Sequence, residues 1–177
     1  ASGREIRGSL LPESASIHAF SETVRETLRT DENVEARLDE HVSSADETRA
    51  LGIEVGDFVF FDPRYEVSPA GFIKSRFLDD KACVAFMFGA IKALADAKKS
   101  PVNTTIFYIT NYEELGHGIS VVPQNVAEHV ALDVGIVAPP ANSREDTVTI
   151  VARDSRTPYD FEFRKFLSDL AVKNSVP

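Results

Sequence analysis

The second half of the chain alternates between helical patterns and short apolar runs, and this alternation limits the fold more than any other feature of the sequence. One helical pattern covers residues 78–99, and another covers residues 160–173. Three apolar runs typical of strands lie between them, at residues 104–110, 128–137 and 147–154. Helices that alternate with apolar strands pack as layers around a sheet. The pattern predicts an α/β domain over residues 74–177, in which helices flank a mixed sheet.

The first 73 residues have a different sequence pattern. Short strand-like runs separated by turn-forming residues occupy residues 4–11, 33–42 and 56–63. Residues 43–52 are typical of a short helix capped by Ser43 or Ser44. We therefore predict a small β-rich, barrel-like module in residues 1–73. The core of a module of about 70 residues gives only marginal stability, so we expect this module to be stabilised by contacts with a neighbouring domain or subunit.

Composition excludes several classes of function. The 177 residues include 43% apolar side chains, enough for a core, and carry a formal charge of -9 from 19 basic and 28 acidic residues. This charge opposes nucleic-acid binding, which depends on basic side chains. Cys83 is the single cysteine and cannot form an internal disulfide, and no apolar run approaches the roughly 20 residues that span a bilayer. The first residues also lack an initiator Met and the apolar segment of a signal peptide. We expect a cytoplasmic protein without a nucleic-acid or membrane partner.

Acidic residues stand at three places where the predicted sheet would bind a ligand. In open α/β sheets, ligands bind beyond the carboxyl ends of the strands. Asp79 and Asp80 begin the first helical pattern, and Glu113 and Glu114 follow the first apolar run. Asp133 lies inside the second apolar run, among aliphatic residues. These carboxylates are the candidates for a functional site.

Each carboxylate also has an ordinary structural explanation, as a helix cap, a solvated loop residue or an acceptor of backbone hydrogen bonds. Asp133 fits such an explanation least, because a carboxylate among aliphatic residues must be paired, bind a cation or carry a raised pKa. Two divalent cations account for all three places together. A pair of cations about 3.5 to 4 Å apart needs one bridging carboxylate and terminal ligands on each ion.

Four segments in order resemble one family of enzymes: "FLDDKACVAFMFGAIKAL", "TNYEELGHGIS", "ALDVGIV" and "RDSRTPYDFEF". They are similar to the glutamyl and deblocking aminopeptidases, a family of dinuclear metallopeptidases that includes the tetrahedral aminopeptidases. The resemblance covers residues 71–165 well. Residues 1–70, with "RGSLLP" and "LGIEVGDFVFFDP", resemble more loosely the β-barrel module that this family inserts into its catalytic domain. The resemblance implies a metallopeptidase-type mixed sheet with flanking helices beside this barrel.

The same resemblance implies a role for each carboxylate. Asp79 matches the bridging metal ligand, Glu114 and Asp133 match terminal ligands, and Asp80 lies behind them as a supporting residue. Glu113 matches the general base. Consecutive side chains of an extended backbone point to opposite sides, so an adjacent pair can send one carboxylate to the metal and the other to the attacking water.

The activity implied is hydrolysis of N-terminal residues from peptides. Two divalent cations, zinc or cobalt, would lower the pKa of a bridging water and polarise the scissile carbonyl, while Glu113 moves the proton. The resemblance also implies peptide substrates and a homo-oligomer. Glycoside hydrolysis by paired carboxylates is rejected, because glycosidase carboxyls flank the bond from opposite faces, about 5 to 9.5 Å apart, and need no metal and therefore none of the accompanying aspartates.

The histidines depart from the family's pattern. The family has one ligand histidine in an upstream His-x-Asp motif and another near its C-terminus, and His18, His41 and His129 match neither. His117 follows the glutamates closely enough to support the site, but a loop histidine without a role is an equal explanation. Carboxylates without imidazole bind zinc weakly. We expect the chain to be the central part of a longer enzyme, and the alternative is an inactive binding or assembly module that keeps the fold.

Overall fold

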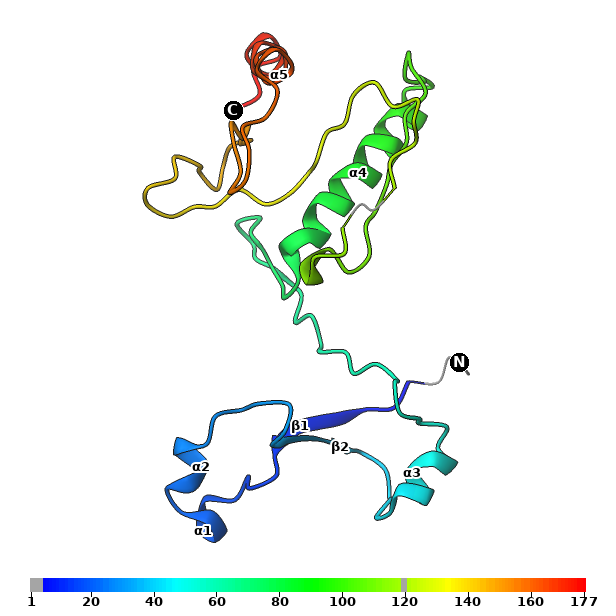
Figure 1. Cartoon of the computed structure of the whole chain (residues 1–177), viewed down its shortest axis with the longest axis vertical. Helices are drawn as coiled ribbons and strands as arrows, with labels where there is room; N and C mark the ends of the chain where they lie inside the picture. Colours follow the sequence, from blue (N-terminus) through cyan, green and yellow to red (C-terminus); the bar gives the residue numbers. More distant parts are fainter. Residues whose placement is uncertain (1–4, 119–120) are drawn as a thin grey trace. The chain divides into compact units, whose positions relative to one another are not determined.

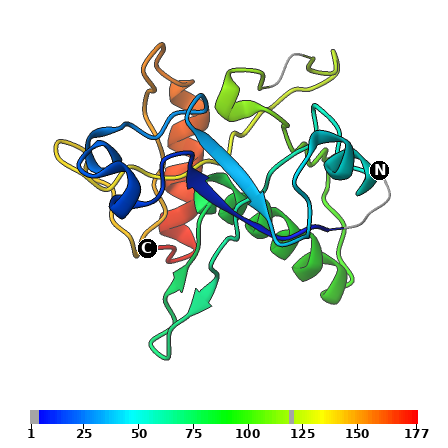
Figure 2. The same cartoon turned by 90° about the horizontal axis from the view of Figure 1, so that it is seen from below.

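The computed structural model describes residues 5–118 and 121–177, shown in two views in Figures 1 and 2. The chain divides into two compact units, residues 1–62 and residues 63–177. The assignment of residues 1–73 to one inserted module remains a prediction. In the described residues, no helix combines the length and the apolar character that crossing a membrane requires.

A two-stranded antiparallel sheet organises the first unit. Strand β1 (Gly8–Pro12) pairs with β2 (Val34–Leu38), in a register that runs from Gly8 opposite Leu38 to Pro12 opposite Val34. The short helices α1 (Ile17–Phe20) and α2 (Thr23–Glu26) lie between the strands in sequence. A Cβ atom at Gly8 would come within 2.5 Å of the Arg37 carbonyl oxygen, so only glycine allows the strands to approach this closely.

Helix α3 (Ala45–Ala50) confirms the predicted cap. The Ser44 hydroxyl accepts a hydrogen bond from the Glu47 N–H at 3.3 Å, and the Glu47 carboxylate accepts one from the Ser43 N–H at 2.7 Å. These bonds satisfy backbone donors that a helix start leaves free. Local sequence is sufficient here because every partner lies within four residues.

The run at residues 56–63 is not part of a strand in the structure. Its aromatic residues Phe58 and Phe60 instead pack on each other, with ring centroids 5.9 Å apart. A strand requires a neighbour for its N–H and C=O groups, and β1 and β2 already pair together. Among the described residues of this unit, one strand pair is present, and the predicted barrel is not confirmed.

The second unit contains the two longest helices. A small hairpin of β3 (Glu66–Val67) and β4 (Ile73–Lys74) precedes helix α4 (Leu78–Asp96). A short 3₁₀ helix, η1 (Glu113–Leu115), follows, and α5 (Phe161–Lys173) ends the unit. Helices α4 and α5 confirm both predicted helical patterns.

The apolar runs between these helices were predicted to form the sheet. In the structure, residues 104–110, 128–137 and 147–154 form no strand, apart from an isolated antiparallel bridge between Arg153 and Pro158. The predicted mixed sheet is therefore not confirmed. Apolar character predicts burial, whereas a sheet also requires a partner at hydrogen-bonding distance. The described chain is a mixture of helices and short antiparallel strand pairs.

Candidate metal centre

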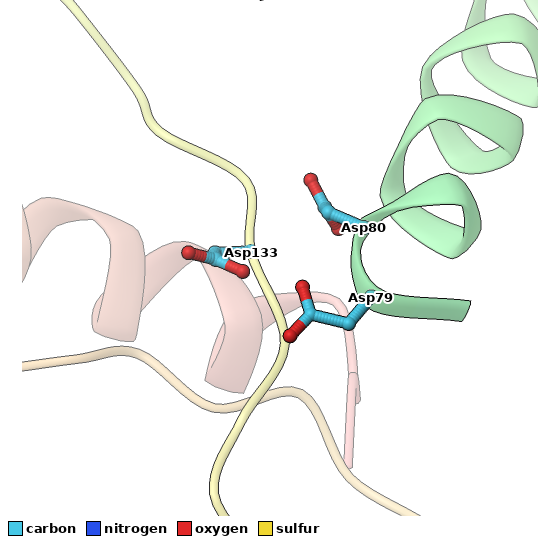
Figure 3. A group of neighbouring side chains, drawn as sticks. All are labelled: Asp79, Asp80 and Asp133. Carbon is cyan, nitrogen blue, oxygen red and sulfur yellow. The ribbon is translucent and has the colours of Figure 1, made fainter. Parts of the chain in front are cut away.

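The start of α4 presents two adjacent aspartates. Phe77, just before the helix, has φ +64°, and Asp79 (φ -84°, ψ 110°) and Asp80 (φ -113°, ψ 30°) interrupt the helical backbone of the first turn. The peptide bond between the two aspartates is cis. Regular helical geometry therefore begins after Asp80, and the two carboxylates lie at the end of the helix, where Figure 3 shows them near Asp133.

Asp133 completes a group of three carboxylates. One oxygen of Asp79, one of Asp80 and one of Asp133 all lie within 4.8 Å of one another. An Asp133 oxygen also accepts a hydrogen bond from the Val134 N–H at 2.7 Å, which orients the side chain against its own backbone. Sequence-distant carboxylates therefore converge, and Asp80 belongs to the same group as the predicted ligands.

Glu114 faces this group from the loop after the first apolar run. The Asp79 carboxylate is the largest cause of a raised pKa at Glu114, followed by burial and by the charges of Glu113 and Asp133. A hydrogen bond with Asp79 contributes to the same shift. The negative charges of Asp79 and Asp133 therefore act on the Glu114 carboxyl and favour its protonated form.

The backbone of the glutamate pair differs from the prediction. Glu113 and Glu114 lie in the 3₁₀ helix η1, after Tyr112 at φ +59°, rather than on extended backbone. With about three residues per turn, consecutive side chains diverge by about 120° instead of pointing to opposite sides. Glu113 lies toward the following loop, where a Cβ atom at Gly118 would be 3.7 Å from its Cγ. Its role as general base remains a prediction.

The histidines do not join the carboxylates. In the part of the chain that the structure describes, the group with metal-ligand spacing contains aspartates alone. The backbone N–H of His117 donates to the Tyr112 carbonyl at 3.0 Å, which closes the loop after η1. The supporting role predicted for its imidazole remains a prediction. The last two residues of the "TNYEELGHGIS" motif lie outside the described residues.

The group has the chemistry of a cation site. One oxygen of Asp80 is buried and has no hydrogen-bond partner among the described residues. A buried carboxylate oxygen without a partner is costly, and neighbouring carboxylates repel one another unless a cation or a proton compensates. Carboxylate oxygens are the ligands that hard and borderline divalent cations accept. The residues present therefore fit a divalent cation.

Cys83 lies one turn further along α4 and is the buried apolar residue of the described chain, with 8% of its surface exposed. Burial is the largest cause that raises the pKa of its thiol to about 12, and the Asp80 carboxylate is the next. Asp133 and Asp79 add smaller contributions. The thiol is therefore protonated and a poor nucleophile at neutral pH.

The structure adds a neighbour that the sequence did not reveal. From the sequence alone, the motif "RDSRTPYD" predicts a strand-to-helix connection before the last helix, with Ser155 or Thr157 as the helix cap. In the structure, the cap of α5 is Asp160, whose carboxylate accepts the Phe163 N–H at 2.7 Å. Tyr159, just before it, has a pKa raised by burial and by the carboxylates of Asp154 and then Asp133. Only the fold could show that the charge of Asp133 acts on this tyrosine.

Comparison with known proteins agrees with this chemistry. The sequence model of the family described as M42 glutamyl aminopeptidase matches residues 1–177. YhfE of Bacillus subtilis (strain 168), a candidate aminopeptidase by its name, is 40% identical over 177 residues, which cover 99% of this chain and 51% of that protein. The chain thus spans about half the length of the curated relative that it matches.

Proposed function

This chain belongs to the M42 glutamyl aminopeptidase family, and from this premise we propose that it carries the carboxylates of a metal-dependent aminopeptidase site. The observation that supports the proposal is the convergence of Asp79, Asp80 and Asp133 around a buried carboxylate oxygen without a partner. Carboxylates gathered in this way repel one another and destabilise the fold, so their contribution to stability does not explain the group. Binding of a divalent cation does explain it, because the cation compensates the negative charges.

Two divalent cations, zinc or cobalt, are the proposed cofactors. Asp79 would bridge them, Asp133 would be a terminal ligand of one and Glu114 of the other. Asp80, with one oxygen inside the group, would support Asp79. The shift in the pKa of Glu114 supports this arrangement, because its largest cause is the neighbouring Asp79 carboxylate. When bound, the cations would supply Lewis acidity that polarises the scissile carbonyl and makes a water molecule more acidic.

The step that this chain's own residues would catalyse is proton transfer. Glu113 would accept a proton from the attacking water and return it to the amine that leaves when the peptide bond breaks. General acid-base catalysis of this kind typically contributes about 10² to 10⁴ in rate.

The whole protein's activity, substrates and assembly are part of this proposal. Because the chain spans about half of its matched relative, we propose a longer protein in which the ligand histidines of the family lie outside these 177 residues. Peptides would be the substrates and a homo-oligomer the assembled form. The 177-residue chain alone would bind cations weakly and hydrolyse peptides poorly, because imidazole provides much of the affinity of such sites.

The test compares Glu113→Gln with the unchanged protein, as full-length enzyme and as the 177-residue chain. Hydrolysis of aminoacyl p-nitroanilides would be measured with added zinc, cobalt or manganese. We expect the variant to lose about 10² to 10⁴ in kcat with unchanged metal content, and Glu128→Gln, an exposed glutamate of the same unit, to behave as the unchanged protein.

Two results would contradict the proposal. Full-length protein that hydrolyses none of these substrates and binds no cation in calorimetry would indicate the non-catalytic module instead. Activity that persists at full rate after complete removal of cations with EDTA would exclude the metal-dependent mechanism.

A further inference from the structure

Gly135 lies two residues after Asp133, at a point where a second segment of the chain packs against its backbone. A Cβ atom at position 135 would lie 3.1 Å from the hydroxyl oxygen of Thr149 and 3.6 Å from that of Ser143. Non-bonded atoms are best separated by about 3.5 to 4.0 Å, so a side chain at this position would have to displace its neighbour. The φ angle of Gly135 lies outside the left-handed region, so the backbone itself would accept another residue. The neighbouring segment, rather than the backbone conformation, therefore makes glycine the residue that fits.

The segment that packs against this glycine, residues 143–149, is held in place by its own hydrogen bonds. The Arg144 guanidinium donates to both oxygens of the Asp146 carboxylate, at 3.0 and 2.6 Å. The Val148 N–H donates to the Pro177 carbonyl, beyond α5 in the sequence, at 2.9 Å. These bonds tie the segment to itself and to the end of the unit. A side chain added at the glycine would therefore tend to move the backbone on the glycine's own side of the contact.

The backbone that would move carries Asp133. Its carboxylate accepts a hydrogen bond at 2.7 Å from the N–H of Val134, the residue between Asp133 and the glycine. Another constraint comes from the aspartate group, because an Asp133 oxygen lies within 4.8 Å of oxygens of Asp79 and Asp80, as Figure 3 shows. Asp133 lies on a segment without regular secondary structure, so packing rather than a helix or a strand pair fixes its position.

We propose that Gly135 is a positioning residue of the candidate metal centre. The absence of a side chain at this position lets residues 143–149 pack beside Asp133, and this contact holds the Asp133 carboxylate at a distance from Asp79 and Asp80 that one cation can bridge. This inference rests on the proposed function. Gly135 contacts neither the cation nor the substrate and acts through Asp133. Metal centres respond strongly to such support, since a change in a residue that holds a ligand in place typically lowers metal affinity about 10- to 100-fold.

The test measures the affinity of the metal-free, full-length protein for zinc and for cobalt by titration calorimetry. Gly135→Ala places a methyl group against Thr149, so we expect the affinity to fall about tenfold. Gly89→Ala is the matched control, because a Cβ atom at this glycine of α4 would meet no neighbouring segment within 4 Å. The affinity of Gly89→Ala should equal that of the unchanged protein.

Second changes at position 149 separate this contact from any other effect of the alanine. Gly135→Ala/Thr149→Ala removes the hydroxyl group and leaves the Cβ atom of residue 149 at 3.4 Å from the new methyl group, an ordinary contact. This double variant should recover most of the lost affinity. Gly135→Ala/Thr149→Val keeps a branched side chain of nearly the same shape and should bind cations as weakly as Gly135→Ala.

The melting temperature of the metal-free protein distinguishes positioning from a general loss of structure. A displaced Asp133 repels Asp79 and Asp80 less, and an alanine in place of glycine reduces the freedom of the unfolded chain. We therefore expect Gly135→Ala to weaken cation binding without lowering the melting temperature. A melting temperature that falls together with the affinity would assign Gly135 a structural role and overturn the inference. Equal recovery by alanine and by valine at position 149 would overturn it as well.

The outcome also separates the inference from the proposed function. If the unchanged protein binds cations and hydrolyses aminoacyl p-nitroanilides, and Gly135→Ala binds cations equally well, the inference falls and the proposed function stands. If the unchanged protein binds no cation, the proposed function falls and takes the inference with it.

Discussion

A carboxylate oxygen of Asp79 lies within 4.8 Å of one of Asp133, although the two residues belong to different segments of the chain. Asp79 stands at the start of α4, and Asp133 lies beyond η1 on a segment without regular secondary structure. Two carboxylates at this distance repel one another in the absence of a cation or a shared proton. The relationship therefore predicts how the protein responds to cations, to pH and to removal of either charge.

The first prediction concerns cation affinity. Asp133→Asn removes a charged ligand and keeps the size of the side chain. Loss of a residue that only supports a metal ligand lowers metal affinity about tenfold or more, so we expect the affinity for zinc or cobalt to fall by at least this factor. Titration calorimetry on the metal-free protein measures it. Asp169→Asn is the control, because Asp169 pairs with Lys165 on the exposed surface of α5. Unchanged affinity in Asp133→Asn would remove this residue from the site.

The second prediction concerns pH. The pKa of Glu114 is raised from its ordinary value of 4.5, chiefly by Asp79, so the metal-free folded state binds a proton more readily than the unfolded state. The free energy of unfolding should therefore increase as pH falls from neutrality toward 4.5, and this part of the dependence should be absent in Glu114→Gln. Urea unfolding of both proteins at a series of pH values gives the difference. A difference that is flat between pH 7 and pH 4.5 would contradict the predicted proximity of the two carboxylates.

The third prediction uses the single cysteine as a probe of the site. The pKa of Cys83 is raised from 9.0 to about 12 by burial and the nearby aspartates. Three pH units correspond to about a thousandfold less thiolate, the form that reacts. Alkylation by iodoacetamide at pH 8 should be slower than that of the unfolded chain by about this factor. Because Cys83 is the sole cysteine, mass spectrometry reports its reaction directly, and equal rates in folded and unfolded protein would show that the thiol is not buried.

The fourth prediction concerns the last helix. The Asp160 carboxylate caps α5 by accepting the Phe163 N–H at 2.7 Å. Asp160→Ala should destabilise the helix by about 1 kcal/mol, while Asp160→Asn, which still accepts this bond, should cost far less. Thermal unfolding followed by circular dichroism compares the two variants. Equal losses would indicate that charge near the helix dipole, rather than the cap bond, stabilises α5.

The sequence determined the elements whose hydrogen bonds are local. The helical patterns predicted α4 and α5, and Ser44 predicted the start of α3, because a helix satisfies its N–H and C=O groups within four residues. The cap of α5 was predicted at Ser155 or Thr157 and lies at Asp160 instead. The wrong choice arose because several side chains near a helix start can accept the same N–H group, and the backbone between them selects one.

The sequence also identified the chemistry of the site but not its geometry. Acidic residues at the start of a helical pattern, after one apolar run and inside another were the predicted site residues, namely Asp79, Asp80, Glu113, Glu114 and Asp133. The family is shown by comparison with known proteins. The tertiary structure decided which of them meet, placed Asp80 in the group, and changed the glutamate pair from extended backbone to a 3₁₀ turn. Contacts between residues far apart in sequence depend on how the chain returns on itself, which no local pattern contains.

The predicted strands show most clearly which properties the sequence predicts and which the tertiary structure decides. The composition of residues 104–110 and 128–137 predicted strands, but pairing depends on a neighbour that supplies the opposite half of each hydrogen bond, and in the structure these runs form no strand. Tyr159 is the converse case, because its sequence context suggested only a connection, while the fold brings it within reach of the charge on Asp133. Sequence by itself determined residue chemistry and short-range hydrogen bonding. Tertiary structure decided every property that requires two segments distant in sequence to lie close together in space, because only the folded chain fixes the distance between them.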